Sequence, residues 1–172
     1  LPYLREWQME YPETGLQIYN RPSPLCVEAV RNNKCTLGIV NIYTELLEDR
    51  QMEVIPLTNL HDVFVGGAQY KRKRRYTIEE IMLEPMLLLE SGSASRIFFD
   101  ELLADYQKSP DFELGSLDVL LDLLRINMGI SLVPREFVEK ELAEGTLVEL
   151  KSSIQVPSRQ VGLVRSRMAP LP

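Results

Sequence analysis

The sequence has few of the side chains that most often carry out chemistry in proteins. Among its 172 residues there are one histidine, His61, and two cysteines, Cys26 and Cys35. Two cysteines are too few for a disulfide scaffold, and their spacing matches no zinc-binding pattern. We interpret them as small, partly buried side chains in a reducing cytoplasm. A redox pair is the less favoured alternative, because no basic neighbour is evident that would activate a thiol.

The motifs of common enzyme classes are absent as well. His61 has Asp62 beside it, but a hydrolytic triad also needs a nucleophilic serine, and the GxSxG elbow does not occur. The phosphate-binding patterns GxGxxG and GxxxxGK(S/T) are missing, as are HExxH and an acidic calcium loop. The sequence therefore predicts no cofactor, no metal site and no enzyme activity. A small enzyme that depends on His61 is the weakest alternative.

Long hydrophobic runs and a basic surface are also lacking. No apolar run approaches the roughly 20 residues that span a bilayer, and no signal peptide is visible. The net charge of −6 argues against a nucleic-acid surface on this chain, since phosphate binding rests on a basic patch. One cationic run, 71–75, is more typical of a solvated loop than of a phosphate site. The start at Leu1 and the loop-like end at Pro172 lead us to expect a fragment of a longer protein.

Short apolar strands that alternate with amphipathic helices make up most of the sequence. This alternation predicts parallel sheets covered by helices. The strands are too many for one compact sheet, and Gly66-Gly67 breaks one of them just before the cationic run, so we expect two lobes. The last strand should return to the first lobe, because short connections are preferred. The expected strands span 16–19, 36–40, 52–57, 62–65, 86–89, 111–114, 129–133, 146–150 and 160–164, and the expected helices span 1–11, 25–32, 95–107, 116–127 and 134–144, with a short helix after a capping box at Thr77 and Glu80.

Small polar residues lie where several expected strands end and helices begin. They are Ser23, the run from Ser91 to Ser95, and Gly115-Ser116. In an open parallel sheet the carboxyl ends of the strands line the ligand crevice, and a helix start there offers free amides and a partial positive charge that suit an anion. Arg96 adds a guanidinium that can hold a carboxylate at two points. The alternative is that each serine is only a helix cap, worth about 1 kcal/mol. Several such turns favour a shared pocket, provided that the strand ends converge.

The expected helix over 116–127 is apolar around most of its circumference. A core stripe is formed by Leu117, Leu120, Leu121 and Leu124, whereas Val119, Leu123 and Ile126 lie largely off it. Such a helix is either deeply buried or part of an interface between subunits. The sequence leaves both possibilities open.

Five segments, at residues 1–12, 28–39, 90–100, 114–134 and 142–150, share a pattern and an order with a known family. Together they resemble the regulatory domain of LysR-type transcriptional regulators. The run LGSLDVLLDLLRINMGISLVP, residues 114–134, is similar to the family's pattern of a helix with leucines that leads into a Gly-Ile strand ending in Leu and Pro. Residues 1–12 resemble the first regulatory helix, and residues 28–39 resemble the segment that ends in the next strand, with Thr36 in the usual Asp position. Residues 90–100 and 142–150 resemble the effector loop and the closing stretch. The resemblance covers nearly the whole chain.

The resemblance implies an α/β fold of two Rossmann-like lobes joined by two crossover strands, as in type 2 periplasmic-binding proteins. Residues 1–65 and 161–172 would form the first lobe and residues 66–160 the second. A small-molecule effector, anionic on the reasoning above, would bind between the lobes. Its contacts, carried over by position, would be Ser23, Ser93, Ser95, Arg96, Gly115 and Ser116. A first strand, which should precede Leu1 and supply more contacts, is not in this sequence.

The resemblance also implies partners and a location. The domain would form a homodimer, with regulatory domains side by side in opposite directions, and a tetramer in the full-length protein. DNA would be bound only through an N-terminal winged helix-turn-helix domain that this chain lacks. The protein would be cytoplasmic, with no membrane contact and no redox sensing, since the cysteines are not placed as in peroxide-sensing members. The main alternative is a solute-binding protein of a transporter with the same fold, which would be exported and monomeric.

Overall fold

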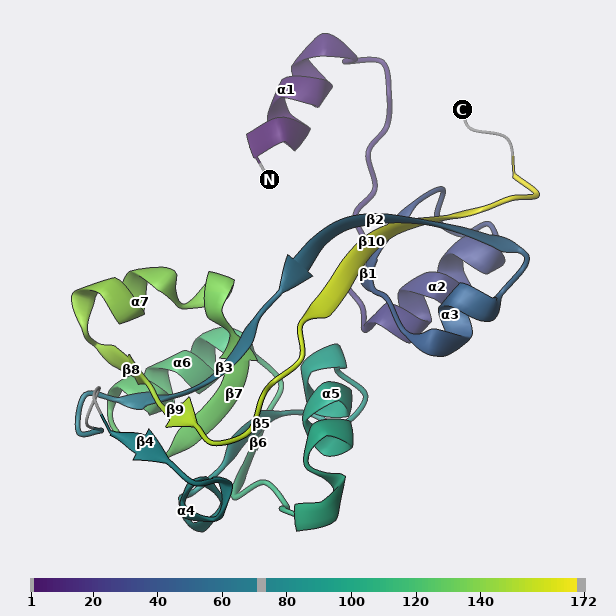
Figure 1. The fold of residues 1–172 in the computed structure, drawn as a ribbon. Helices are drawn as coiled ribbons and strands as arrows, with labels where there is room; N and C mark the ends of the chain where they lie inside the picture. The colour runs from purple at the N-terminus through teal and green to yellow at the C-terminus, as the bar shows by residue number, and fades with distance from the viewer. Residues whose placement is uncertain (1, 71–73, 170–172) are drawn as a thin grey trace.

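The protein is seen here as a computed structural model that describes residues 2–70 and 74–169. Its elements form two groups that are joined by long strands (Figure 1). A first helix, α1 (Pro2–Glu10), stands apart from both groups at the end of a loop. The expected helix over 1–11 is therefore confirmed. Its side chains Tyr3 and Met9 are exposed.

The first lobe is a three-stranded sheet with helices packed against it. Its strands β1 (Gly38–Asn41), β10 (Arg159–Ser166) and β2 (Met52–Leu60) lie in the order β1-β10-β2, with both pairings antiparallel. The helices are α2 (Ser23–Arg31) and α3 (Thr44–Glu48). The middle strand is the last one in the chain, so the predicted return of the final strand to the first lobe is confirmed. The small core consists of Val27, Val30, Val40, Leu46, Met52 and Val164.

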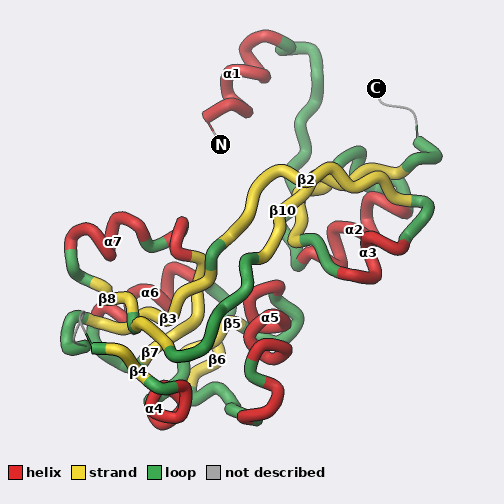
Figure 2. Tube along the Cα trace, in the orientation of Figure 1, coloured by secondary structure: helices red, strands yellow, loops and turns green. Residues whose placement is uncertain are grey.

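The second lobe is built around β3 (Asp62–Gly67), which pairs antiparallel with β7 (Ile130–Pro134) and with β8 (Leu147–Glu149). Strands β5 (Leu87–Leu89) and β6 (Phe112–Leu114) pair in parallel, and a parallel bridge from Met86 to Ile130 joins them to β7. The short strands β4 (Arg75–Tyr76) and β9 (Lys151–Ser152) also pair in parallel. The remaining elements are the helices α4 (Ile78–Leu83), α5 (Ala94–Leu102), α6 (Leu117–Arg125) and α7 (Glu139–Glu144), and the 3-10 turns η1 (Ala104–Tyr106) and η2 (Arg135–Phe137) (Figure 2).

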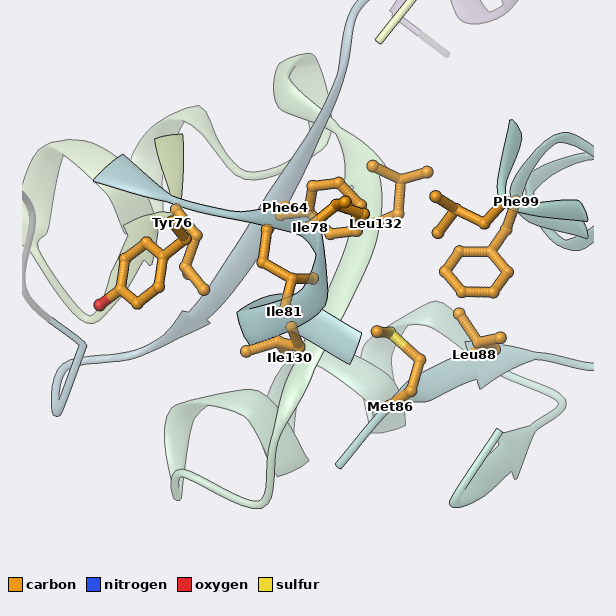
Figure 3. Packing of buried hydrophobic residues seen from close by; sticks show 11 residues of the cluster. Phe64, Tyr76, Ile78, Ile81, Met86, Leu88, Phe99, Ile130 and Leu132 are labelled. Carbon is orange, nitrogen blue, oxygen red and sulfur yellow. The ribbon is translucent and has the colours of Figure 1, made fainter. Parts of the chain in front are cut away.

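Two hydrophobic clusters cover opposite faces of this second sheet. Neighbouring residues of a strand point to opposite faces, so Phe64 belongs to one cluster and Val65 to the other. Strand β7 behaves in the same way, with Leu132 in the first cluster and Val133 in the second. Figure 3 shows the first cluster, where Met86 and Phe99 close around the sheet. Because both faces of this sheet are buried, the loops at the ends of its strands are attached to a well-packed core.

Two strands explain why most pairings are antiparallel, although parallel sheets were predicted. Strand β3 enters the second lobe directly from the first, and β10 enters the first lobe directly from the second. Each arrives without a crossover helix and runs against its neighbours. Strands β5, β6 and β7, which are linked through helices α5 and α6, run parallel as predicted.

Several local predictions are confirmed. At the start of α4 the Thr77 hydroxyl accepts a hydrogen bond from the Glu80 amide at 3.2 Å, and the Glu80 carboxylate accepts one from the Thr77 amide at 3.0 Å. Gly145 ends α7 with a φ of 78°, a left-handed conformation that glycine adopts without a side-chain clash.

Other local predictions are wrong. Residues 16–19 form no strand, because they have no partner strand among the described residues. Gly66 and Gly67 do not break β3. Both lie within the strand. Glycine is needed at these positions because a Cβ at Gly66 would sit 2.4 Å from the Tyr70 ring, and one at Gly67 would sit 2.2 Å from Asn127 Oδ1. The helix expected over 95–107 is instead α5 followed by η1, and the one expected over 134–144 is η2 followed by α7. Elements α3, β4 and β9 were not expected.

The cationic run lies partly outside the described residues, which exclude 71–73. Of its described members, Arg74 forms an ion pair with Glu80, and its guanidinium lies 5.0 Å from the centroid of the Tyr76 ring. In the described part of the chain, no helix is long and apolar enough to span a bilayer.

The exact limits of the two lobes remain a prediction. Strand pairing places all of β3, from Asp62, in the sheet of the second lobe and all of β10, from Arg159, in the sheet of the first. This pairing favours a boundary close to His61 rather than between Val65 and Gly66. The chain then passes between the lobes before Asp62 and again before Arg159.

Candidate functional site

A small cavity of about 40 Å³ lies in the second lobe, where β5 and β7 end and where α5 and α6 begin. Its wall is mainly apolar, with Ser95, Arg96 and Ser131 as the polar contributors. The apolar lining residues are Leu88, Leu89, Leu117, Leu120, Leu132, Val133, Pro134 and Phe137.

The parallel strands bring this site together. Because β5, β6 and β7 run in the same direction, their carboxyl ends meet at one edge of the sheet. After β5 the Glu90 amide donates to the Leu114 carbonyl at 3.0 Å, which ties the turn before α5 to the end of β6. The convergence on which the predicted pocket depended is therefore present for the starts of α5 and α6.

Of the six predicted contact residues, Ser95 and Arg96 line the cavity. Arg96 is not a free cation, however. Its Nε donates to Asp100 at 2.9 Å and its Nη1 to Glu113 at 2.9 Å. Burial acts to lower the pKa of Arg96, but the hydrogen bonds to Asp100 and Glu113 outweigh it and raise the pKa above its ordinary value. The guanidinium is thus held by two carboxylates of its own lobe.

The other predicted residues lie around the site without lining the cavity. Ser93 caps α5, since its hydroxyl accepts from the Arg96 amide at 3.2 Å. Ser116 precedes α6 with no cap hydrogen bond from its side chain, and a Cβ built at Gly115 would lie 3.8 Å from the Glu90 carboxylate. Ser23 belongs to the first lobe, where its buried hydroxyl accepts from the Asn41 amide at 3.1 Å.

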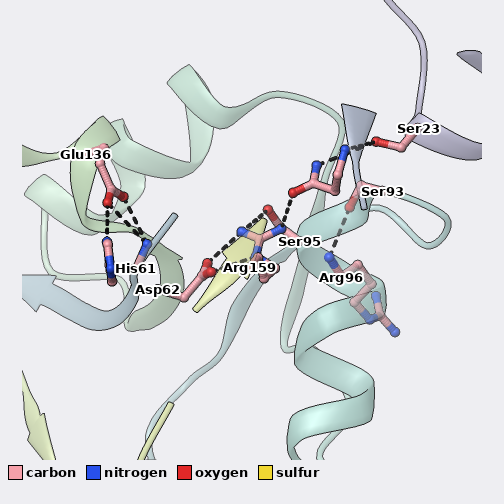
Figure 4. A network of polar contacts seen from close by, with 9 residues as sticks. Ser23, His61, Asp62, Ser93, Ser95, Arg96, Glu136 and Arg159 are labelled. Atoms are coloured by element: carbon pink, nitrogen blue, oxygen red, sulfur yellow. Dashed lines mark hydrogen bonds and ion pairs between the residues drawn. The ribbon is translucent and has the colours of Figure 1, made fainter. Parts of the chain in front are cut away.

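A buried ion pair next to the cavity was not predicted from the sequence. Arg159 Nε donates to Asp62 Oδ2 at 2.6 Å, and Arg159 Nη2 donates to Asp62 Oδ1 at 2.7 Å. Arg159 also reaches Asn41 Oδ1 at 3.3 Å and Ser95 Oγ at 3.4 Å, and its guanidinium lies 4.9 Å from the centroid of the Phe98 ring. Asn41 thereby joins Ser23 to Arg159, which in turn contacts Asp62 and Ser95. Figure 4 shows the side chains of Ser23, Arg159, Asp62 and Ser95.

No local signal in the sequence could have revealed this pair. Asp62 and Arg159 are 97 residues apart, and each is simply the first residue of a strand. A second unpredicted feature is the hydroxyl of Ser131, which lines the cavity and is buried without a hydrogen-bond partner among the described residues. An unpaired buried hydroxyl is costly, so it is commonly matched by a ligand or by water.

His61 has a separate environment. Its Nδ1 lies 2.7 Å from Glu136 Oε1, and its side chain is 63% exposed. Burial acts to raise the pKa of Glu136, but the hydrogen bond from His61 and the backbone contacts lower it overall. Within the described residues, no group of side chains could hold a metal ion. His61 also donates from its backbone amide to the Glu136 carboxylate at 3.2 Å, and its carbonyl accepts from the Arg135 amide at 2.8 Å. It therefore links the crossover before β3 to η2 through both its ring and its backbone.

A cavity at the carboxyl ends of parallel strands, in an α/β fold of two lobes, lies where such folds bind ligands. The family model described as "LysR substrate binding domain" matches residues 1–172, and the chain belongs to this family. It is thus the effector-binding regulatory domain of a LysR-type transcriptional regulator, with the fold of type 2 periplasmic-binding proteins, and it is not an enzyme. This family membership decides against the transporter alternative.

Curated relatives are longer bacterial regulators. The chain is 31% identical over 90 residues to the HTH-type transcriptional regulator CbbR of Rhodospirillum rubrum. This alignment covers 51% of this chain and 30% of that protein. It is 25% identical over 154 residues to the uncharacterized HTH-type transcriptional regulator YeiE of Escherichia coli K12. This alignment covers 86% of this chain and 50% of that protein. The chain therefore spans half or less of the length of these relatives.

Solved structures share the fold at low identity. The CcmR regulatory domain of Synechocystis PCC6803 in complex with 2-PG has a TM-score of 0.81 at 20% identity, covering 98% of this chain and 82% of that chain. The effector-binding domain of QuiR in complex with shikimate has a TM-score of 0.72 at 18% identity, covering 91% and 74%. Full-length HypT from Salmonella typhimurium has a TM-score of 0.75 at 18% identity, covering 90% and 53%.

Proposed function

We propose that this domain binds a small anionic effector between its two lobes and thereby changes how the full-length regulator holds DNA. The observation that carries the proposal is the cavity at the ends of β5 and β7, beside a polar network that reaches from Ser23 in one lobe to Ser95 in the other. The complexes of CcmR with 2-PG and of QuiR with shikimate support a small-molecule ligand. Shikimate carries a carboxylate, which fits an anionic effector.

The proposed contacts are the six predicted residues, with different weight. Ser95 and Arg96 line the cavity and come first. Gly115 and Ser116 would offer backbone amides at the start of α6. Ser93, whose own amide donates to the Glu90 carbonyl at 3.2 Å, would contribute from the turn before α5, and Ser23 from the first lobe. A ligand that differs in affinity between open and closed lobes shifts the domain toward the arrangement it prefers, and only by that difference. Closure of the lobes is our proposed form of the signal.

The whole protein's assembly is likewise proposed. We propose a homodimer through the regulatory domain, a tetramer at full length, a cytoplasmic location, and DNA contact only through an N-terminal winged helix-turn-helix domain outside this chain. The support within the structure is an apolar stripe on the outer side of α6, where Val119 is 49% exposed and Ile126 is 66% exposed. Apolar side chains that gather on one exposed face often mark an interface.

The test is thermal unfolding of this chain against a panel of small carboxylates, phosphates, sulfur oxyanions, amino acids and sugars, with 2-PG and shikimate included. A ligand present at about a hundred times its dissociation constant stabilises the folded state by roughly 2.7 kcal/mol. We expect at least one anionic compound to raise the unfolding temperature. We also expect it to reduce the radius of gyration measured by small-angle X-ray scattering.

A matched pair of variants locates the binding. Ser95→Ala removes a hydroxyl of the cavity wall and should weaken binding of the compound found, whereas Ser91→Ala changes an exposed residue of the preceding turn and should not. Equal binding by both variants would place the effector elsewhere. Failure of every compound to alter the unfolding temperature would contradict the proposed function.

A further inference from the structure

The feature that carries a further inference is the guanidinium of Arg159. Arg159 is 8% exposed and Asp62 is 5% exposed, so the two form an ion pair that is largely removed from water. A buried charge needs its partners, because removal from water is costly unless charge and hydrogen bonds are both satisfied. The contacts around Arg159 therefore determine how well its charge is stabilised in the interior.

A guanidinium offers two edges, each of which can hold a carboxylate or phosphate at two points. The edge made of Nε and Nη2 is occupied by Asp62, at 2.6 and 2.7 Å. The edge made of Nη1 and Nη2 faces only neutral oxygens, Asn41 Oδ1 at 3.3 Å and Ser95 Oγ at 3.4 Å. These contacts are longer than the 2.7–2.9 Å or so that is typical of a cation bound to an anion. The second edge is thus poorly satisfied.

The position of this edge relates it to the cavity and to both lobes. Asn41 is the last residue of β1 in the first lobe, and Ser95 lies in the first turn of α5 in the second lobe. Ser95 also lines the cavity, as does Ser131, whose buried hydroxyl has no partner among the described residues. The cavity wall thus carries two hydroxyls, and one of them, that of Ser95, is also a contact of the second edge of Arg159.

We infer that the second edge of Arg159 is the anion-binding group of the effector site. A carboxylate or phosphate of the ligand would replace Asn41 Oδ1 and Ser95 Oγ on Nη1 and Nη2, and the Ser131 hydroxyl would donate to another oxygen of the ligand. The inference rests on the proposed function and adds the residue that recognises the charge. Arg96, the residue that the sequence favoured for this purpose, already binds Asp100 and Glu113.

The same contacts would make the anion a link between the lobes. Binding on this edge releases Asn41 of the first lobe and Ser95 of the second from Arg159, and both are then free to donate to or accept from the ligand. The partial positive charge at the start of α5, beside Ser95, offsets the repulsion between the incoming anion and Asp62. Recognition of the charge and the relative position of the lobes are therefore coupled at one side chain.

The experiment compares acidic probes with neutral ones on paired variants. The probes are shikimate, its neutral methyl ester, 2-PG, inorganic phosphate and uncharged sugars, measured by calorimetry and thermal unfolding at matched ionic strength. Arg159→Gln together with Asp62→Asn removes both buried charges at once, so no unpaired charge is left in the interior. Arg159→Lys keeps the charge but loses the two-point edge. Arg31→Gln, which breaks an ion pair with Asp49 away from the cavity, is the control.

We expect the acidic probes to bind the wild-type chain more tightly than the methyl ester and the sugars. The double variant should lose about tenfold or more in affinity for the acids, Arg159→Lys should lose less, and Arg31→Gln should bind as the wild type does. Circular dichroism shows whether each variant is folded. If the double variant unfolds, Arg159→Lys alone, with the ester comparison, decides the question.

The contrary outcomes separate this inference from the proposed function. Equal binding of acids by the double variant and the wild type would overturn the inference, as would equal binding of shikimate and its ester, while an effector site would still exist. Binding of neutral probes alone would overturn it too. If no probe of either kind binds, both the inference and the proposed function fail.

Discussion

Ser93 and Ser95 lie two positions apart at the start of α5, yet their hydroxyls have different surroundings. The Ser93 hydroxyl accepts from the Arg96 amide, as a helix cap does, whereas the Ser95 hydroxyl faces Arg159 and the cavity. At the residue scale, one turn therefore combines a structural serine with a candidate ligand contact. The sequence left open whether these serines cap the helix or line a pocket. Ser93 is a cap, whereas Ser95 lines the cavity.

We predict that Ser93→Ala lowers the free energy of unfolding by about 1 kcal/mol, because the Arg96 amide loses its cap acceptor. Urea unfolding followed by circular dichroism measures the change. Ser91→Ala is the control, since Ser91 is exposed and precedes the cap. A loss of stability as large for Ser91→Ala as for Ser93→Ala would contradict the assignment of the cap.

The sequence predicted the residues of this turn but not those of the ion pair, for a physical reason. Capping depends on residues within one turn of a helix, so Ser93 and the box at Thr77 can be identified from spacing. The pairing of Asp62 with Arg159 depends on two crossings between the lobes. Only the assembled fold brings such residues together.

At the scale of elements, α6 is buried along one side, while an interface on its other side stays a prediction. Leu120, Leu121 and Leu124 are buried in the second cluster, with Leu117 and Leu123 packed against it, so the helix is a core element. Val119 and Ile126 remain exposed on the outer side. The helix is therefore buried along the predicted core stripe, and part of its opposite side is exposed to solvent.

We predict that Val119→Glu weakens the proposed homodimer while the monomer stays folded. Light scattering after gel filtration should show a shift toward monomer, and the free energy of unfolding should change by no more than about 0.5 kcal/mol, because the site is exposed. Leu124→Ala is the contrast: it empties a fully buried site and should cost about 2–5 kcal/mol. A dimer that survives both Val119→Glu and Ile126→Glu would place the interface on another surface.

The strand predictions that failed did so for a related reason. Residues 16–19 have an apolar pattern, but a strand also requires a neighbouring edge to pair with, and none is present among the described residues. Gly66 and Gly67 were read as a break, whereas the helix end at Asn127 and the ring of Tyr70 require small residues there. Helices satisfy their own backbone, so their prediction depends less on distant residues.

At the scale of the whole molecule, the family resemblance conveyed the two lobes and the crossovers better than periodicity did. Periodicity predicted parallel sheets, and this was right for β5, β6 and β7, which are joined through helices, and for the short pair β4 and β9. The first lobe depends on a strand from the far end of the chain, because β10 lies between β1 and β2. The second lobe has its own sheet, in which β10 takes no part. The two lobes should therefore differ in how they depend on the end of the chain.

We predict that a chain ended at Ser158, which lacks β10, loses the first lobe and keeps the second. Without β10 neither β1 nor β2 has a partner strand in the described sheet, and the core loses the fully buried Val164. Hydrogen exchange should then show rapid exchange of amides in β1 and β2 but continued protection of those in β3 and β7.

The shortened chain should also carry Asp62→Asn, because an unpaired buried carboxylate would by itself cost about 3–5 kcal/mol. A full-length chain with Asp62→Asn and Arg159→Gln is the control for that change. Protection that persists in β1 and β2 would show that the first lobe does not depend on the returning strand, and loss of protection in all four strands would show that the two lobes unfold as one unit.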